Sequence, residues 1–436
     1  MLRKPPEHLN PNKALDAIQE PTWTTLECQL VTPMYGGGVV SHTVDEKMPI
    51  RVSSIRGQLR FWWRLLATNS SDDLWQRDAG LSIRQAEADL WGGIDDKTKA
   101  SKVFLRVDNI KSLQIEAWAT YEINSRTGRY QSLPSPKNWA NVPYVLFPAQ
   151  GKRPDVNDAE TPHALAKIGL EWNLIIGFVE NLQPDPKKPE YNPNITATQK
   201  QQVWEAIRWW SQFGGVGART RRGLGAVLLK NARGEEVPCN LQTPISTDEV
   251  QQAGCRLLLR TPQNSAYAAW QQAIQKLQTF RQVNVGRPDH SSRSRWPEPD
   301  AIRNIKKQHS PNHKPVHIAG NLFPRAAFGL PIIFKFKDDG TRRTDEPSQS
   351  SLQPVVIGNV KERMASPLIL RPFYTKEKKW VSAALLLPCQ HIQKLQLDLS
   401  GSKVSYWDET KAQNVQPIAQ YNGTDALSAF LNFFAR

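Results

Sequence analysis

Hydrophobic and polar residues alternate with two different periods along this chain of 436 residues, and the two periods predict strands and helices in a mixed order. Apolar residues at every second position predict a half-buried strand over Thr25–Thr32. Helical spacing predicts helices over Ile55–Thr68, with Ser53 and Ser54 as N-cap residues, and over Gln199–Phe213. With the strands expected between them, the order is strand, helix, strand, then strand, helix, strand, which is typical of a ferredoxin-like domain.

The second half of the chain repeats this mixture of elements after a polar stretch over Asn231–Gln251. The further expected elements are a short strand at Tyr144–Phe147, strands at Arg256–Arg260 and Val381–Leu387, helices at Ala266–Gln278 and Thr424–Phe434, and a basic, aperiodic segment at Arg287–Lys314. We therefore predict an α+β protein of two tandem ferredoxin-like domains with loop insertions. The first domain covers residues 1–235 and the second covers residues 236–436.

Net charge points to an anionic partner. The 56 Lys and Arg residues exceed the 41 Asp and Glu residues, which gives a formal charge of +15, and 39% hydrophobic residues exclude a wholly disordered chain. Basic side chains that neutralise phosphates release counterions, so nucleic acid is the leading candidate. The 15 tryptophans offer faces for unpaired bases, although most are expected to lie in the core.

Membranes, disulfides and cysteine-bound zinc are not indicated. No apolar run approaches the roughly 18–20 residues that a membrane span needs. The N-terminus lacks the apolar stretch of a secretory signal, and the four cysteines lie far apart without a CxxC pair. We therefore predict a cytoplasmic protein.

Arginines four residues apart make Arg51–Arg64 (RVSSIRGQLRFWWR) the most informative segment. On the predicted helix, Arg56, Arg60 and Arg64 form a cationic row, and we expect no acidic partner to be spaced to neutralise it. Free N–H groups at the helix start, near Ser53, Ser54 and Gly57, would add donors for a phosphate. This combination predicts a site for the phosphate backbone of RNA.

Glycines and arginines alternate again over Phe213–Gly225 (FGGVGARTRRGLG). Such a loop can bring backbone amides close to phosphates while arginines clamp them. The segment lacks the GK[ST] ending of a P-loop, and no GxGxxG pattern opens a helix, so a nucleotide-triphosphate site is not supported.

Catalytic and metal-binding patterns are weak. His309, His313 and His317 are four apart, but Pro311 and Pro315 interrupt the helix that would make this a chelating spacing. His42, Asp45 and Glu46 follow an early glycine loop and could reach a ribose hydroxyl or hold a metal, although a polar loop flank is the simpler interpretation. We predict no cofactor, no metal and no catalytic residue.

Several segments, in this order, resemble the RAMP superfamily of CRISPR-associated proteins, and within it the family of first subunits of the type III-B Cmr complex. The segments that carry the resemblance are Thr32–Gly38, Arg51–Arg64, Glu87–Gly92, Phe213–Gly225, Arg293–Arg303, Phe323–Pro331 and Arg363–Pro372. The RxSSxxGxLRFWWR-like helix is the most specific of them. Asp45 lies four residues before Pro49-Ile50-Arg51, a looser spacing than that of the RNA-cleaving RAMP subunits, so catalysis is not carried over.

The resemblance implies RRM-related domains and a place in a multi-subunit ribonucleoprotein, with guide RNA, target RNA and other Cmr subunits as partners. Together with the charge pattern it predicts a non-catalytic subunit that grips the 3′ part of the guide RNA. The predicted RNA contacts are Arg51, Ser53, Ser54, Arg56, Gly57, Arg60, Arg64, Gly214, Gly215, Gly217, Arg219, Arg221, Arg222, Gly223, Arg293, Arg295 and Arg303. The alternatives are a metal-dependent endoribonuclease that uses Asp45 and a protein scaffold whose basic loops face acidic subunits.

Overall fold

Two compact units make up the part of the chain that the computed structural model describes: residues 22–76, 80–94, 98–137, 143–183, 192–234, 237–289, 292–336 and 345–436. Unit 1 comprises the described residues of Met1–Glu116, Ala164–Ala218 and Gly225–Ile245; unit 2 comprises those of Ala117–His163, Arg219–Leu224 and Ser246–Arg436. The division differs from the predicted boundary between 235 and 236. Ala117–His163 and Arg219–Leu224 were expected in the first domain and belong to unit 2.

Unit 1 is built around a four-stranded sheet with two long helices. Its main elements are β1 (Thr24–Leu30), α2 (Val52–Asn69), α3 (Ile83–Trp91), β5 (Val103–Lys111), β10 (Glu171–Phe178), α5 (Ala197–Phe213) and β11 (Val227–Arg233). Shorter strands are β2 (Met34–Tyr35), β3 (Gly93–Ile94), β4 (Thr98–Lys99), β9 (Ala164–Ala166) and β6 (Ile115–Ala117), the last of which ends at the unit boundary. The predicted strand at Thr25–Thr32 and helices at Ile55–Thr68 and Gln199–Phe213 are confirmed, with small shifts of their ends.

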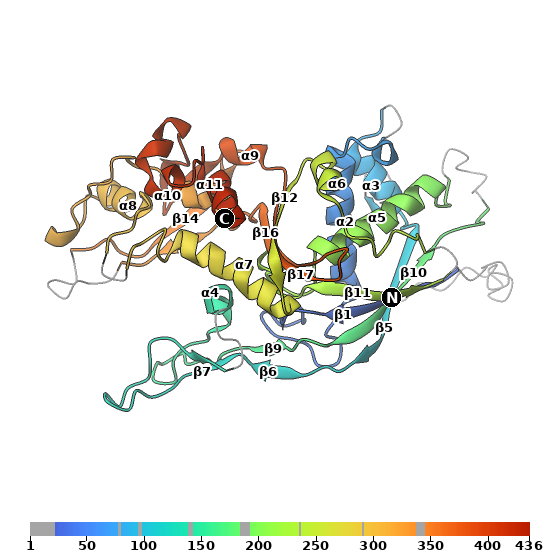
Figure 1. Ribbon diagram of the computed structural model, residues 1–436, viewed down its shortest axis with the longest axis horizontal. Helices are drawn as coiled ribbons and strands as arrows, with labels where there is room; N and C mark the ends of the chain where they lie inside the picture. The colour runs from blue at the N-terminus through green and yellow to red at the C-terminus, as the bar shows by residue number, and fades with distance from the viewer. Residues whose placement is uncertain are drawn as a thin grey trace, which may run out of the picture. The chain divides into compact units, whose positions relative to one another are not determined.

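The strand order of this sheet is β11-β1-β10-β5, and all neighbouring strands are antiparallel. With α2 between β1 and β5 and α5 between β10 and β11, this is the connectivity of a ferredoxin-like domain. Both helices lie on the same side of the sheet (Figure 1). The opposite side of the sheet therefore carries the residues that the alternation in β1 leaves half-exposed.

Tryptophans form much of the core of unit 1. Inward residues of β1, such as Leu26 and Leu30, are fully buried beneath the helices. Where α2 meets α5, the Trp62 ring lies 5.8 Å from that of Trp209 and 6.2 Å from that of Phe213. Aromatic rings at these separations bury large apolar areas and fix how the two helices pack. The expectation that most tryptophans lie in the core is confirmed for the described residues.

Unit 2 contains a larger number of short elements. Its helices are α4 (Pro143–Leu146), α6 (Thr247–Gln252), α7 (Ala266–Arg281), α8 (Glu298–Lys306), α9 (Gln390–Gln393), α10 (Gln416–Ala419) and α11 (Ala426–Ala435). Its strands are β7 (Ala119–Thr120), β8 (Ser135–Pro136), β12 (Arg256–Gln263), β13 (Ile332–Phe334), β14 (Ser350–Val356), β15 (Asn359–Val360), β16 (Leu368–Tyr374), β17 (Trp380–Leu386), β18 (Gln396–Leu399) and β19 (Ser402–Ser405).

Two sheets organise unit 2. One has the order β12-β17-β16, and α7 packs on it; the other has the order β13-β14-β18-β19. The elements β12, α7, β16 and β17 correspond to three of the four strands and one of the two helices of a ferredoxin-like domain, and α11 follows them in the chain. Among the described residues, no fourth strand pairs with the free edge of β12. The structure thus shows an α+β protein with several sheets, and a second complete ferredoxin-like domain is not confirmed.

One expectation about local structure was wrong. Tyr144–Phe147 was expected to be a strand, but Pro143 begins a helical turn, α4, where its fixed φ and missing N–H are both tolerated.

The basic segment at Arg287–Lys314, which shows little periodicity in the sequence, contains α8, whose first turn holds Glu298 and Asp300. Acidic side chains near a helix N-terminus are favourable, and the buried Ile302 anchors this short helix.

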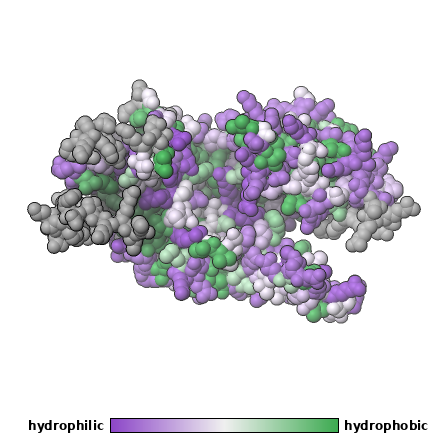
Figure 2. Space-filling model, turned by 180° about the vertical axis from the view of Figure 1, so that it is seen from behind, coloured by the Kyte–Doolittle hydropathy of each residue, from purple (hydrophilic) through white to green (hydrophobic). Residues whose placement is uncertain are grey.

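One face of the molecule is mostly hydrophilic. In the view from behind, hydrophobic residues form scattered groups among hydrophilic ones (Figure 2). Among the described residues, no helix has both the length and the apolar character needed to cross a bilayer.

Candidate nucleic-acid interface

The start of α2 differs from the starts of the other long helices of unit 1. Its N-cap residue is Arg51, and no side chain caps the helix, so the prediction of Ser53 and Ser54 as caps was wrong. They lie in the first turn and are exposed. In contrast, Ser82 and Thr196 cap α3 and α5 with reciprocal capping boxes. A helix without a cap leaves its first amides to solvent or to a ligand.

Two backbone amides at the start of α2 have no acceptor within the part of the protein that the structure describes. Ser54 N–H reaches Arg51 C=O at 3.1 Å, whereas the amides of Val52 and Ser53 have no hydrogen-bond partner among the described residues. No acidic side chain lies in this turn. Amide dipoles and the helix dipole therefore favour an anion here, as they do at phosphate-binding helix starts.

Gly57 adds an open helix surface next to this turn. A Cβ atom placed on Gly57 would meet no heavy atom within 4 Å, and the residue is exposed. A glycine inside a helix costs about 1 kcal/mol relative to alanine. Packing within unit 1 does not require this glycine, so it leaves room for another molecule to approach the helix backbone closely.

Arg56 is used inside the fold. Its guanidinium donates to Ser101 Oγ at 2.8 Å and to Val103 C=O at 3.0 Å, which ties α2 to the beginning of β5. Burial lowers the pKa of Arg56, and the positive charge of Arg60 lowers it further. Its donors are thus directed at the protein rather than at solvent.

Glu87 of α3 neutralises the other two arginines of the row, Arg60 and Arg64. Arg60 Nε lies 2.6 Å from Glu87 Oε1, and Arg64 Nη1 donates to the same oxygen. The expectation that no acidic residue neutralises the row was wrong, because the carboxylate comes from a different helix. The side chains of Arg60 and Arg64 remain 33% and 43% exposed, so parts of both guanidiniums still face solvent.

Arg51 completes this surface. Its side chain is half-buried, and its Nε has no hydrogen-bond partner among the described residues although it is shielded from solvent. An unpaired buried donor is costly unless a ligand or water satisfies it. The α2 cradle, as we call Arg51, Ser53, Gly57, Arg60 and Arg64, combines free amides, an open backbone and three guanidiniums.

The glycines of the second segment are fixed by packing. Gly214 caps the end of α5 and its N–H donates to Trp210 C=O at 2.7 Å, while Gly215 C=O accepts from Trp210 Nε1 at 3.2 Å. Gly217 has φ +75°, and an added Cβ would lie 2.6 Å from Met34 Cγ. Gly223 is buried. These glycines allow close packing within the protein.

The arginines of the second segment are also held internally, in unit 2. Arg222 donates to Leu368 C=O at 2.9 Å and to Phe328 C=O at 2.7 Å, and burial lowers its pKa to about 9. Arg221 donates to Ser366 C=O, and burial lowers its pKa as well. Arg219 lies over the Phe147 ring, with Cζ 5.0 Å from the ring centroid.

The third group of predicted arginines has internal partners too. Arg293 donates to Lys314 C=O at 2.6 Å, and Arg295 donates to Asn284 C=O at 2.9 Å. Arg303 is buried, and its Nε lies 2.9 Å from Glu346 Oε2. The structure therefore joins these three arginines to the fold of unit 2.

Residues considered for catalysis have structural contacts. His42 Nδ1 lies 2.7 Å from Tyr35 Oη, and Asp45 Oδ1 accepts from the amides of Lys47 and Met48 at 2.9 and 3.0 Å. His313 Nδ1 lies 2.6 Å from Glu346 Oε1. The described residues contain no group of three or more His, Cys, Asp or Glu side chains placed to hold a metal ion.

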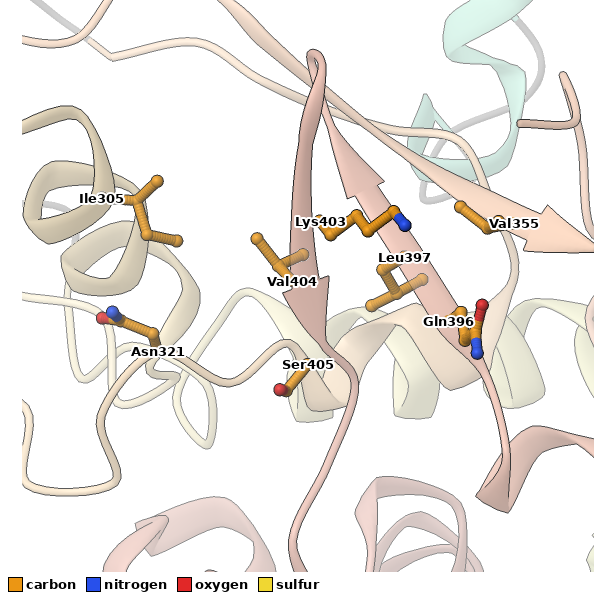
Figure 3. Close-up of a pocket in the computed structure, with 8 residues that line it drawn as sticks. All are labelled: Ile305, Asn321, Val355, Gln396, Leu397, Lys403, Val404 and Ser405. Atoms are coloured by element: carbon orange, nitrogen blue, oxygen red, sulfur yellow. The ribbon is translucent and has the colours of Figure 1, made fainter. Parts of the chain in front are cut away.

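A cavity of about 420 Å³ lies in unit 2 between α8 and the β14-β18-β19 face (Figure 3). Its lining residues are Ile305, Asn321, Val355, Gln396, Leu397, Lys403, Val404 and Ser405. Four are aliphatic and one is cationic. The cavity contains none of the predicted RNA contacts, so it does not correspond to a predicted phosphate site.

Comparison with known proteins gives one family match, which includes most of unit 1 and the segments Ala117–His163 and Arg219–Leu224 of unit 2. Residues 27–228 match the model of the RAMP superfamily. The match covers slightly less than half of the chain, so it shows a likeness to the RAMP superfamily over these residues. The RAMP segment contains both α2 and the glycine/arginine loop. No curated protein matches the chain.

Solved structures resemble the chain only weakly. The apo crystal structure of Cmr1 from Pyrococcus furiosus is 16% identical, covers 87% of this chain and 98% of that one, and has a TM-score of 0.41. A chain from the cryo-EM structure of the type III-B Cmr-beta complex bound to cognate target RNA is 12% identical, covers 92% of this chain and 99% of that one, and has a TM-score of 0.45. At these values the likeness carries no argument about what this chain binds.

Sequence reasoning missed Glu87 as the partner of the arginine row. It lies 27 residues from Arg60 and 23 residues from Arg64 along the chain, on a separate helix. The structure supplies the signal, because Glu87 is buried in α3 together with the apolar residues Ala88, Leu90 and Trp91. A charge in such a position requires a partner of opposite sign nearby.

Proposed function

We propose that this chain is a non-catalytic, RNA-binding subunit of a type III-B CRISPR (Cmr) effector. In this proposal it holds the 3′ part of the guide RNA, and paired target RNA, together with other Cmr subunits. The RAMP superfamily match over residues 27–228 and the formal charge of +15 support it. The motif resemblance over Arg51–Arg64 supports the more specific assignment to a Cmr subunit.

The observation that carries the proposal is the uncapped start of α2 beside exposed arginines. Amides of Val52 and Ser53, the open surface of Gly57 and the accessible parts of Arg60 and Arg64 belong to one helix. Amide donors suit single phosphate oxygens, and guanidiniums can bind phosphates through two parallel hydrogen bonds. We therefore assign the backbone of RNA to the α2 cradle.

The remaining predicted contacts have a smaller part in the proposal. Arg221, Arg222 and Arg303 are bonded to carbonyls or carboxylates, so we propose that they shape unit 2 instead of binding phosphate. Arg295 donates to Asn284 C=O and joins this structural group, whereas Arg293, which is exposed although it donates to Lys314 C=O, stays as a secondary RNA contact together with Arg219. We further propose that unit 2 is a reduced ferredoxin-like domain, since its β12-β17-β16 order matches three of the four strands.

The test uses the full chain and a labelled single-stranded RNA taken from a guide. For single strands, log affinity falls with log salt with a slope of about 0.7 per neutralised phosphate. Five or six contacts predict a slope near 4 and a loss of affinity of about a hundredfold or more between 50 and 200 mM salt. A flat salt response would remove the electrostatic basis of the proposal.

Crosslinking in the assembled complex locates the contact. Photo-crosslinks from the 3′ part of the guide to residues 51–64 are expected. Crosslinks confined to other subunits would favour the scaffold alternative. RNA cut at fixed positions, with cutting lost in Asp45→Ala, would favour the endoribonuclease alternative.

A further inference from the structure

Trp23 is the exception among the tryptophans of this protein. Of those that the structure describes, it is the one that is exposed, with 37% of its surface accessible, whereas nine are among the largest fully buried side chains. It lies immediately before β1, in unit 1. An exposed indole offers an accessible aromatic surface, which is suitable for stacking.

The strand register brings a second aromatic ring to Trp23. Thr24 of β1 pairs with Ile176 of β10, and Phe104 of β5 pairs with Gly177. Continuing the antiparallel register places Trp23 opposite Gly177, so that glycine separates the two aromatic residues across three strands. Their ring centroids lie 6.3 Å apart at 56°, and Phe104 is 43% exposed.

Both rings lie on the face of the sheet that the helices do not cover. Val103 is buried, whereas the alternate residues Phe104 and Arg106 are exposed, as expected for opposite faces of one strand. Arg106 Cζ lies 5.6 Å from the Trp23 ring centroid, and its side chain is 60% exposed. Arg106 Nη2 lies 3.4 Å from Asp108 Oδ2, and this long ion pair is itself exposed.

We infer that Trp23, Phe104 and Arg106 form a stacking platform for unpaired bases of RNA. This inference rests on the proposed RNA-binding function and adds to it a second contact of different chemistry. Indole and phenyl rings stack on any base, and a guanidinium can stack on a base plane or bind the adjoining phosphate. Bases in a duplex already stack on their neighbours, so the platform selects single-stranded nucleotides.

The surroundings favour a base over an apolar protein segment. Along the same face, Glu171 pairs with Lys230 at 2.7 Å, and Asn173 donates to Asp108 at 3.1 Å. The aromatic pair is thus bordered by polar and ion-paired residues, and the apolar Ile175 of β10 on the same face is buried. Protein docking sites of comparable strength require a continuous apolar centre.

The experiment tests whether RNA binding requires an aromatic ring at these positions or only an apolar side chain. Trp23→Leu and Phe104→Leu keep an apolar side chain without a π system, while Trp23→Tyr and Phe104→Tyr keep the ring. Affinity of the full chain for a twelve-nucleotide oligouridine is measured by fluorescence anisotropy over a range of salt. Thermal unfolding of every variant shows whether the fold is retained.

Each leucine variant is expected to bind oligouridine about tenfold more weakly, and each tyrosine variant within about twofold of the natural chain. The salt slope should stay the same in all four, because stacking releases no counterions. For an abasic oligomer of the same length, the leucine and tyrosine variants should have equal affinity. Arg106→Lys should keep the salt slope and lose part of the affinity for oligouridine.

Equal binding by the leucine and tyrosine variants overturns the platform. If the natural chain then still binds RNA with a steep salt slope, the proposed function stands without it. A natural chain that binds no RNA at any salt concentration overturns both. Loss of affinity for the abasic oligomer in the leucine variants would also contradict stacking.

Discussion

The α2 cradle and the glycine/arginine loop contain the same residue types and have opposite roles. In the cradle, glycine leaves an open surface and Arg60 and Arg64 remain partly exposed. In the loop, Gly217 is packed against Met34, and Arg222 donates to two carbonyls of unit 2. Arginine and glycine together therefore indicate a phosphate site only where their donors are not already used by the protein.

Burial is the physical reason for the difference. A guanidinium removed from water must replace its hydration with hydrogen bonds, and carbonyl oxygens of the chain serve as well as phosphates. Once Arg222 has those bonds, binding RNA would require breaking them. Arg64 loses little on exchanging part of its contact with Glu87 for a phosphate. The comparison leads to five measurements, given from the largest expected effect to the smallest.

Arg222→Met should have the largest effect, and on stability. The carbonyls of Leu368 and Phe328 would lose their donor in a buried site, which costs about 3 kcal/mol. Urea unfolding of the full chain should show this as a lower midpoint, while RNA affinity of the folded protein changes by less than about twofold. Normal stability with a large loss of RNA affinity would return Arg222 to the RNA contacts.

Arg60→Gln combined with Arg64→Gln should lower RNA affinity by about tenfold at low salt and reduce the salt slope by about 1.4. The two side chains supply exposed positive charge to the cradle. Lys376→Gln combined with Lys379→Gln, in the turn between β16 and β17, removes the same net charge and is the control. An equal loss in both double variants would mean that net charge alone, without the cradle, determines binding.

Glu87→Gln should strengthen RNA binding by about threefold and steepen the salt slope. The substitution removes the carboxylate that holds both Arg60 and Arg64, and so releases their guanidiniums toward a ligand. Asp89→Asn on the same helix is the matched control, because Asp89 pairs with Lys102 at 2.8 Å and not with the row. Weaker binding by Glu87→Gln would show that the ion pairs are needed to position the arginines.

Gly57→Ala should raise stability by about 0.5–1 kcal/mol, since alanine is the better helix former and its Cβ would meet no neighbour within 4 Å. The methyl group should also weaken RNA binding a few-fold if a phosphate approaches the helix closely. Gly217→Ala is the contrasting case and should destabilise the protein, because φ is +75° and Met34 occupies the space. Unchanged RNA affinity in Gly57→Ala would place the phosphates elsewhere.

Low pH should weaken the contacts of Asp89 with Lys102 and Gln199 in unit 1, and with them the stability of the fold. Burial raises the pKa of Asp89, but hydrogen bonds from Lys102 and Gln199 and the charges of Lys102 and Lys99 outweigh it, so the net shift of that pKa is downward. A carboxyl with a depressed pKa stabilises the fold above its unfolded pKa, and this contribution is lost as pH falls through the folded value. Asp89→Asn should therefore reduce the loss of stability below about pH 4.

Long periodic segments could be predicted from the sequence, and irregular ones could not. The apolar stripes of α2 and α5 and the alternation in β1 are clear in the sequence, because each of these elements buries one face in the core of unit 1. Tyr144–Phe147 has too few residues to show a period, and Pro143 decides its helical turn. The cap of α2 was misplaced because two serines near a helix start look the same in sequence whether or not their side chains bond to the helix amides.

Charge, composition and the helix that holds the arginine row were determined by the sequence alone, because they depend on residue types and on spacing within one element. Which arginines remain available was decided only by the tertiary structure. Glu87, Leu368 and Phe328 reach the arginines from distant parts of the chain. The same holds for Trp23 and Phe104, which the sheet register brings together. Hydrogen bonds and ring contacts form between groups a few ångströms apart in space. The number of residues between two groups along the chain does not give that distance, so the sequence alone does not identify these partners.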